Sequence, residues 1–200
     1  MSKFSFKPSV NCPADDRTAF LSEQRGFTAV ELLIVVAILG VFLAWAVPAL
    51  GLVGKSAKLS SQTNSFLSIM HLARSEAIKR NSRVTLCKSS EGVTCAQSGG
   101  WQQGWLVFHD KNNDGLRGLD ETIIYQVQVL PNNLRLIGNQ NVAEYVSFTP
   151  SGGTKLASGA LQMGTLTLCF ASNDATEARE IVINAAGRAR TQKVTASSCV

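Results

Sequence analysis

The chain has 200 residues, of which 45% are apolar and 16% are charged, and its formal net charge at pH 7 is +5. This charge is mildly positive and lacks the density of basic residues that is typical of dedicated nucleic-acid-binding proteins, so the sequence does not belong to that class. The sequence contains no low-complexity tract and no internal repeat, and it is long enough for one domain with its own core.

The first predicted element is an apolar helix near the N-terminus. Residues 32–54 carry no charge, and a stretch of this length can cross a bilayer as a helix. Arg25, Gly26 and Phe27 stand just before the helix, and Glu31 is a lone carboxylate at its start. An unpaired charge in hydrocarbon costs several kcal/mol, so Glu31 is expected to have a specific partner. An ordinary membrane anchor leaves Glu31 unexplained, and a secretory signal peptide has a shorter apolar core followed by a small-residue cleavage site.

This arrangement resembles the class III signal of type IV prepilins and type II secretion pseudopilins, in which a basic leader ends in Gly and the mature chain begins with Phe and has Glu fifth. The resemblance implies that prepilin peptidase cleaves between Gly26 and Phe27 and that the new Phe27 amine is methylated. It also implies that Glu31 neutralises the N-terminal amine of a neighbouring subunit during assembly. Residues 1–26 are then a cleaved leader and residues 27–54 a transmembrane helix. The leader is longer than many pilin leaders, which leaves the true start codon open.

Residues 55–82 are predicted to continue the helix as an amphipathic segment that packs on a sheet. Pro48, Gly51 and Gly54 weaken the helix where it leaves the apolar stretch, which predicts a kink or local melting. Apolar side chains then recur at spacings of three and four residues and form a stripe on one face. This stripe consists of Phe66, Met70, Ala73, Ala77 and Ile78.

From residue 83 onward, short strand-like segments alternate with Gly and Asn clusters. About seven strands are expected, at residues 84–87, 104–108, 122–129, 145–148, 166–170, 180–184 and 188–194. The predicted fold class is therefore α+β, with a long N-terminal helix followed by an antiparallel, sandwich-like β domain at residues 83–200. Trp101 and Trp105 are expected to lie in the core or to cover the sheet.

Five cysteines are present, and Cys12 leaves with the leader. If the leader stays in the cytoplasm, the β domain faces an oxidising periplasm, where disulfides persist. The remaining four cysteines allow three pairings. We favour Cys87–Cys95, which closes a short loop, and Cys169–Cys199, which ties down the chain end. A zinc site is the alternative, but there is no CxxC motif and neither histidine has ligand-like spacing.

Three segments of the β domain carry a second, less specific resemblance. Residues 71–87 (HLARSEAIKRNSRVTLC), 99–115 (GGWQQGWLVFHDKNNDG) and 180–190 (EIVINAAGRAR) resemble the FimT/FimU minor pilins and the related H-type minor pseudopilins, GspH. This resemblance covers nearly all of residues 26–194. It mostly reflects the fold, so it does not separate the two groups.

The loop from Asp110 to Glu121 matches D-x-[DN]-x-[DN]-G-x5-E, the oxygen spacing of an EF-hand calcium loop. The flanking residues read as strands, whereas an EF-hand has helices there, and Arg117 adds a cation at the eighth position. A hairpin turn rich in Asn, Asp and Gly explains the same residues. We favour the plain turn, with calcium as the alternative, and expect no resident metal and no cofactor.

The second candidate site is Gly187-Arg188-Ala189-Arg190, followed by Lys193. Gly187 suits a hairpin turn, and Arg188 and Arg190 share one face of the returning strand, about 6.6–7 Å apart. That spacing suits successive phosphates, which Arg binds in a bidentate way. FimT-like pilins that act in DNA uptake resemble this sequence here, with a Gly-Arg-x-Arg motif. The alternative is an ordinary solvated strand face.

We find no nucleophile motif and no phosphate-binding loop, and His71 and His109 are expected to be structural or solvent-exposed, so the protein is not predicted to be an enzyme. The sequence predicts a minor pilin, held in the inner membrane by one span with its C-terminal domain in the periplasm and later built into a type IV pilus. The expected partners are other pilin subunits, prepilin peptidase, membrane lipid and, through Arg188, Arg190 and Lys193, DNA. The alternative is an H-type minor pseudopilin of type II secretion.

Overall fold

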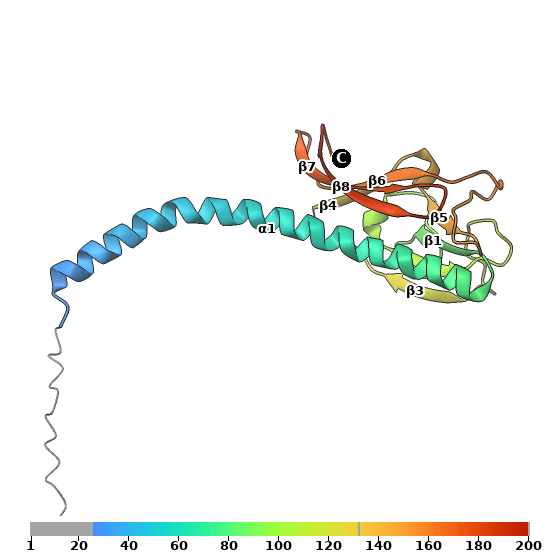
Figure 1. The fold of residues 1–200 in the computed structure, drawn as a ribbon, viewed down its shortest axis with the longest axis horizontal. Helices are drawn as coiled ribbons and strands as arrows, with labels where there is room; N and C mark the ends of the chain where they lie inside the picture. Colours follow the sequence, from blue (N-terminus) through green and yellow to red (C-terminus); the bar gives the residue numbers. More distant parts are fainter. Residues whose placement is uncertain (1–25, 132, 200) are drawn as a thin grey trace, which may run out of the picture. The chain divides into compact units, whose positions relative to one another are not determined.

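The computed structural model describes residues 26–131 and 133–199, except for the side chains of residues 45–52. The predicted leader lies outside the described residues apart from Gly26, and Cys12 lies outside them with it. The chain divides into two compact units, Met1–Ala46 and Val47–Val200. Figure 1 shows the helix and strands of these units.

The first unit contains the beginning of helix α1 (Ala29–Arg80). Thr28 caps this helix, because its hydroxyl accepts a 3.2 Å hydrogen bond from the backbone N–H of Glu31. The side chains of residues 29–44 are exposed on every side of the helix, although nearly all of them are apolar. A helix that is apolar all round is normally covered by other apolar groups.

Within the described part of the chain, no helix combines the length and the apolarity that crossing a membrane requires. The transmembrane segment predicted at residues 27–54 includes residues 45–52, whose side chains lie outside the described ones, and the span stays a prediction. The predicted local melting near Pro48 is wrong, because α1 is continuous through residues 48–54. One proline removes one backbone hydrogen bond and leaves those of the neighbouring turns.

In the second unit, the remainder of α1 buries one face against the β domain. Phe66, Met70, Ala73 and Ala77 are at most 1% exposed, as the predicted stripe requires. Ile78 is 51% exposed, so its assignment to the stripe is wrong. Successive helical residues point about 100° apart, so Ile78 cannot face the core together with Ala77.

The β domain consists of two antiparallel four-stranded sheets, with strand orders β3-β2-β1-β5 and β4-β6-β7-β8. This arrangement confirms the predicted α+β class with its antiparallel sheets. The sequence missed β4, and β7 begins earlier than predicted. The strands are β1 (Val84–Lys88), β2 (Trp105–His109), β3 (Ile123–Val127), β4 (Leu134–Gly138), β5 (Tyr145–Phe148), β6 (Gly164–Phe170), β7 (Thr176–Ile183) and β8 (Ala189–Ala196).

One hydrophobic core joins the helix to both sheets. At its centre Phe66 packs edge-on against Trp101 and Trp105, with ring centroids 5.6 and 4.9 Å apart. Both tryptophans are almost fully buried, as predicted. Edge-to-face pairs add to the free energy gained from burial. This core fixes the second part of α1 against the sheets and so positions the loops and hairpins at their ends.

Candidate functional site

The N-terminal motif lies in exposed chain directly before α1. Phe27 is 80% exposed, and a Cβ added at Gly26 would meet nothing within 4 Å. The described fold therefore gives no steric reason for glycine at residue 26. The backbone N–H of Glu31 is bound by Thr28, and its side chain is exposed. The Thr28-x-x-Glu31 spacing is that of a capping box, a local signal for the start of the helix that is present in the sequence.

The hairpin between β7 and β8 depends on a glycine. Gly187 has φ +71°, and its N–H donates to the Asn184 carbonyl at 2.9 Å. The Asn184 side chain in turn accepts the N–H of Arg188 at 3.0 Å. A Cβ at Gly187 would overlap the carbonyl oxygen of Gly152. Only glycine fits this turn, as its place in the sequence suggested.

Arg74 of α1 supports the same hairpin. Its Nε donates to the Gly152 carbonyl at 2.9 Å, and its Nη2 donates to the Ala186 carbonyl at 3.3 Å. The helix therefore holds both loops that meet at Gly187. Sequence reasoning missed this role of Arg74, because the partners lie 78 and 112 positions away.

The strand register places Arg190 on the outer face of the second sheet, and Arg188 stands one residue before β8. Arg190 pairs with Val182, whereas the intervening pair, Ile183 with Ala189, places Ile183 in the core. Because side chains alternate along a strand, Arg188 and Arg190 both point away from that core. Both are exposed, and they line a hollow of about 500 Å³. The structure thus brings the two arginines together as predicted.

The structure does not bring Lys193 to these arginines. Lys193 pairs with Arg179 on the opposite face of β8, since it is an odd number of residues from Arg190. Its Nζ lies 3.1 Å from a carboxylate oxygen of Glu177, which Arg179 also binds at 2.7 Å. Hydrogen bonds from Arg179, then Lys193 and Ser56, lower the pKa of Glu177 to about 2. The alternation of side chains along β8 was enough to predict from the sequence that Lys193 faces away from the arginines. Its ion pair with Glu177 could not be predicted from the sequence.

The outer face also carries one acidic side chain near the arginines. Glu180 accepts a 2.7 Å hydrogen bond from Gln192, its partner across β7 and β8. Glu180 lies two positions from Val182, so it shares the face of Arg190. This carboxylate lowers the positive potential of the surface without pairing with an arginine in the described ion pairs.

The cysteines form the two disulfides favoured from the sequence. Cys87 pairs with Cys95 and Cys169 with Cys199, at Cα–Cα distances of 5.6 and 6.2 Å. The second disulfide is reinforced by two backbone hydrogen bonds between Ser172 and Cys199, of 2.9 and 2.7 Å. These contacts tie the chain end beyond β8 to the loop after β6.

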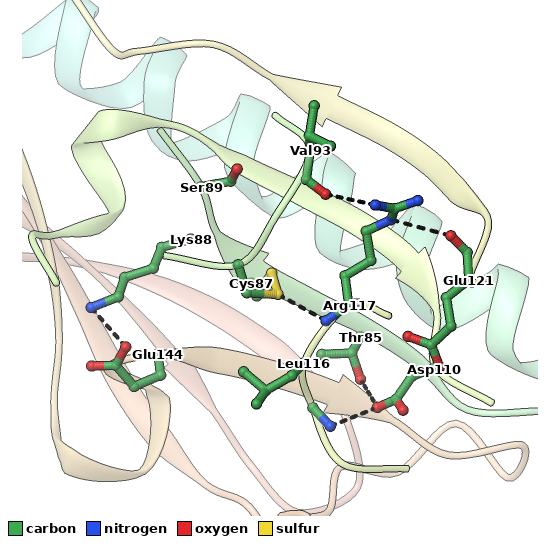
Figure 2. Close-up of a disulfide and its surroundings, with 12 residues drawn as sticks. Thr85, Cys87, Lys88, Ser89, Val93, Asp110, Leu116, Arg117, Glu121 and Glu144 are labelled. Atoms are coloured by element: carbon green, nitrogen blue, oxygen red, sulfur yellow. Dashed lines mark hydrogen bonds and ion pairs between the residues drawn. A yellow bond between two sulfur atoms is a disulfide. The ribbon is translucent and has the colours of Figure 1, made fainter. Parts of the chain in front are cut away.

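The loop from Asp110 to Glu121 lies between strands β2 and β3, as predicted, and holds two buried carboxylates. Asp110 Oδ2 accepts hydrogen bonds from the Thr85 hydroxyl at 2.7 Å and from the Gly115 N–H at 3.1 Å. Figure 2 shows the side chain of Thr85 pointing toward Asp110. Burial raises the pKa of Asp110, and these two hydrogen bonds oppose that effect. Across residues 26–131 and 133–199, no three His, Cys, Asp or Glu side chains are grouped so that they could hold a metal ion.

Arg117 joins this loop to the disulfide loop. Its backbone N–H donates to the Cys95 sulfur at 3.4 Å, and its Nη1 donates to the Val93 carbonyl at 3.0 Å. Its Nε donates to the backbone carbonyl of Glu121 at 3.2 Å (Figure 2). The guanidinium therefore binds main-chain oxygens and none of the loop's carboxylates.

Comparison with known proteins identifies two families. Residues 62–187 match the family described as type II transport protein GspH, and residues 21–47 match the prokaryotic N-terminal methylation motif. No curated protein is significantly similar in sequence to this chain.

Two crystal structures of the type IV minor pilin FimU from Pseudomonas aeruginosa (strain PAO1) have a similar fold. One is 17% identical and covers 71% of this chain and 100% of that one, with a TM-score of 0.51. The other is 16% identical and covers 72% of this chain and 97% of that one, with a TM-score of 0.52.

Proposed function

This chain belongs to the GspH family of type II transport proteins, and we propose that it is a minor pilin of a type IV pilus. At the coarser level, the protein is a structural subunit of the minor pilin and pseudopilin class. In the proposed mechanism, prepilin peptidase cleaves before Phe27 and its amine is methylated. The apolar part of α1 then anchors the subunit in the inner membrane until it enters the helical core of a fibre.

The exposed apolar surface of α1 carries this proposal. Apolar side chains surround the helix from residue 29 to residue 44, next to the accessible Gly26–Phe27 junction. Such a surface is stable only in lipid or against other apolar helices. Membrane lipid and neighbouring subunits supply these two environments in turn.

Glu31 supplies the specific contact of assembly. Its carboxylate is exposed at the start of this apolar helix, close in sequence to the proposed new amine of Phe27. In a neighbouring subunit the amine of Phe27 would pair with Glu31, and such pairs are strong where water is excluded. Insertion into the membrane does not need the pair, because a neutral side chain makes the helix more apolar.

The Glu31→Ala variant tests the assembly step. We expect the variant in the membrane fraction at the wild-type level and a strong loss from sheared fibres. Glu76→Ala is the matched control, since Glu76 lies on the same helix and binds only Lys79 and Arg80 in the described ion pairs. Incorporation of Glu31→Ala at the control level would contradict the proposed role.

The pilus is favoured over a type II secretion fibre by the two disulfides and the Gly-Arg-x-Arg hairpin. The likeness to FimU supports the pilin fold alone, because the identities are 17% and 16%. A deletion strain separates the two machines. Loss of surface pili and twitching with normal protein export supports the pilus, and the opposite result supports the pseudopilin alternative.

A second proposed function is DNA capture by Arg188 and Arg190. Both side chains are exposed on one strand face beside the hollow, and their spacing fits successive phosphates. With two phosphate contacts, log affinity for duplex DNA should fall against log salt with a slope of about −1.8. Binding should show no sequence preference, because the sequence contains no motif of the kind that reads base edges.

The control for DNA binding comes from Lys193. Gel-shift titrations with the full mature chain in detergent compare the double variant Arg188→Gln/Arg190→Gln with Lys193→Gln. We expect the double variant to lose binding and Lys193→Gln to keep it, because Lys193 faces the other way and pairs with Glu177. Equal losses of DNA binding in both variants would show that binding depends only on net charge, and would contradict the proposed site.

A further inference from the structure

We propose that the end of the β domain opposite the predicted membrane span docks the next pilin subunit along the fibre. We call this region the distal surface. It consists of the exposed side chains of Val93, Leu116 and Leu119 and of a cavity beside the Cys87–Cys95 disulfide. The inference rests on the proposed fibre function and adds a contact between β domains to the contact that Glu31 supplies between helices.

The distal surface adjoins the C-terminal end of α1. Arg83 follows that end, and its carbonyl accepts the N–H of Asp110, the first residue of the loop, at 3.0 Å. The other end of the domain meets the helix at Ser56, whose hydroxyl donates to Glu177 at 2.9 Å. The helix is about 36 Å long from Ser56 to Arg80. The distal surface therefore lies at the end of the domain away from the predicted span.

Three large apolar side chains are exposed on the distal surface. Leu119 is 90% exposed, and Leu116 and Val93 are each 48% exposed. A single exposed leucine is ordinary on a protein surface, whereas a group of exposed apolar side chains marks an interaction site. A partner that covers this group would remove all three side chains from water at once.

Arg117 holds the three residues together. Its Nη1 donates to the Val93 carbonyl at 3.0 Å, as Figure 2 shows, and its Nη2 donates to the Leu119 carbonyl at 3.5 Å. Its backbone N–H, directly after Leu116, donates to the Cys95 sulfur at 3.4 Å. The disulfide and the guanidinium thus fix the backbone of both loops before a partner binds. Such preorganisation lowers the entropy cost of binding.

A cavity of about 420 Å³ lies beside Leu116. Its walls include the ring of Tyr145, Ala157 and the Cys87–Cys95 disulfide. The ring is held in place, because the Tyr145 hydroxyl accepts the N–H of Ala157 at 2.9 Å. Binding energy at protein interfaces concentrates on side chains that fill such pockets. The cavity therefore suits one large apolar side chain of the partner, with the three exposed residues around it.

The charges of the distal surface indicate which end of the partner it faces. On the loops at residues 89–97 and 110–121, the exposed charged side chains are the acids Glu91, Asp114 and Asp120 and the base Lys111. Directly after the predicted span, α1 instead carries two exposed lysines, Lys55 and Lys58. Like-oriented subunits in a fibre meet head to tail through two different surfaces. The acidic distal surface therefore fits a pilin subunit that has basic residues just beyond its apolar helix, and the opposite charges orient the encounter.

Two matched substitutions test the distal surface in cells. Leu119→Ser changes the 90% exposed residue, and Val129→Ser changes a 67% exposed residue outside both loops. We expect Leu119→Ser to lower recovery in sheared fibres at least about fivefold, and Val129→Ser to leave it at the wild-type level. Both variants should keep the wild-type membrane level and melting temperature, because exposed side chains contribute little to stability.

A photo-reactive benzoylphenylalanine in place of Leu119 identifies the partner. In sheared fibres it should cross-link to a second pilin subunit, and peptide mapping should place the link just beyond that subunit's apolar helix. The same probe in place of Val129 should give no link there. Absence of the wild-type chain from fibres would contradict the fibre function and the docking surface together. If the wild-type chain is in fibres, recovery of Leu119→Ser at the control level, or no link from residue 119 to a pilin subunit, would overturn the docking surface alone.

Discussion

Replacing Gly187 by alanine tests the turn that presents Arg188 and Arg190. Gly187 adopts a φ of +71°, where an L-residue with a Cβ costs roughly 1–2 kcal/mol. The new Cβ would also overlap the Gly152 carbonyl oxygen, which is backbone and cannot rotate away. That oxygen accepts the hydrogen bond from Arg74, and loss of a hydrogen bond to a charged group costs about 1.5–3 kcal/mol. Together these effects predict a loss of about 2.5–5 kcal/mol in the free energy of unfolding.

Gly159 provides the control for this prediction. Its φ is +86°, and a Cβ there would meet nothing within 4 Å. Gly159→Ala therefore carries the backbone strain without the overlap, and should cost about 1–2 kcal/mol. The smaller entropy of the unfolded alanine chain affects both variants alike and cancels in the comparison.

The assay is urea denaturation of both variants, followed by circular dichroism, together with a DNA gel shift. We expect Gly187→Ala to lose at least about 1.5 kcal/mol more than Gly159→Ala and to bind DNA more weakly. Equal destabilisation by the two substitutions would refute the argument, because it would show that the contact with Gly152 does not constrain the hairpin.

Two further predictions concern the disulfides and the pH dependence of stability. Removing the Cys169–Cys199 disulfide, which closes a separation of 30 residues, should lower the free energy of unfolding by about 3.5 kcal/mol. Removing Cys87–Cys95, with a separation of 8, should lower it by about 2.5 kcal/mol. Denaturation of the two double-alanine variants should show that order. The pKa of Glu177 is about 2 in the folded chain against 4.5 ordinarily, so its stabilisation is present above pH 4.5 and lost as the pH falls toward 2. Glu177→Gln should therefore flatten the fall in melting temperature over that range, and an unchanged acid profile would argue against the ion pairs around Glu177.

The helix and most strands could be predicted because their signals are local. The stripe from Phe66 to Ala77 follows the helical period, and the strand segments alternate between turn residues. Strand β4 was missed because Leu134–Gly138 ends in glycine and follows Pro131, and both residue types mark turns. Its pairing with β6 exists only in the folded chain.

The candidate site could be predicted only where it depends on neighbouring residues. Arg188 and Arg190 share a face because they are two apart, and the same rule, applied further, separates Lys193 from them. The contact of Arg74 with Gly152 and the hydrogen bond from Thr85 to Asp110 join residues that are 78 and 25 positions apart. These contacts exist only in the folded chain, so no spacing in the sequence indicates them.

The mass of the N-terminal peptide tests the account of this protein most directly. The protein is purified from membranes of cells that contain prepilin peptidase, digested, and analysed by mass spectrometry. A first residue of N-methylated Phe27 is the predicted result, and a peptidase-negative strain should retain the Gly26–Phe27 bond. Recovery of an intact Gly26–Phe27 peptide from the peptidase-positive cells would contradict the assignment as a processed fibre subunit.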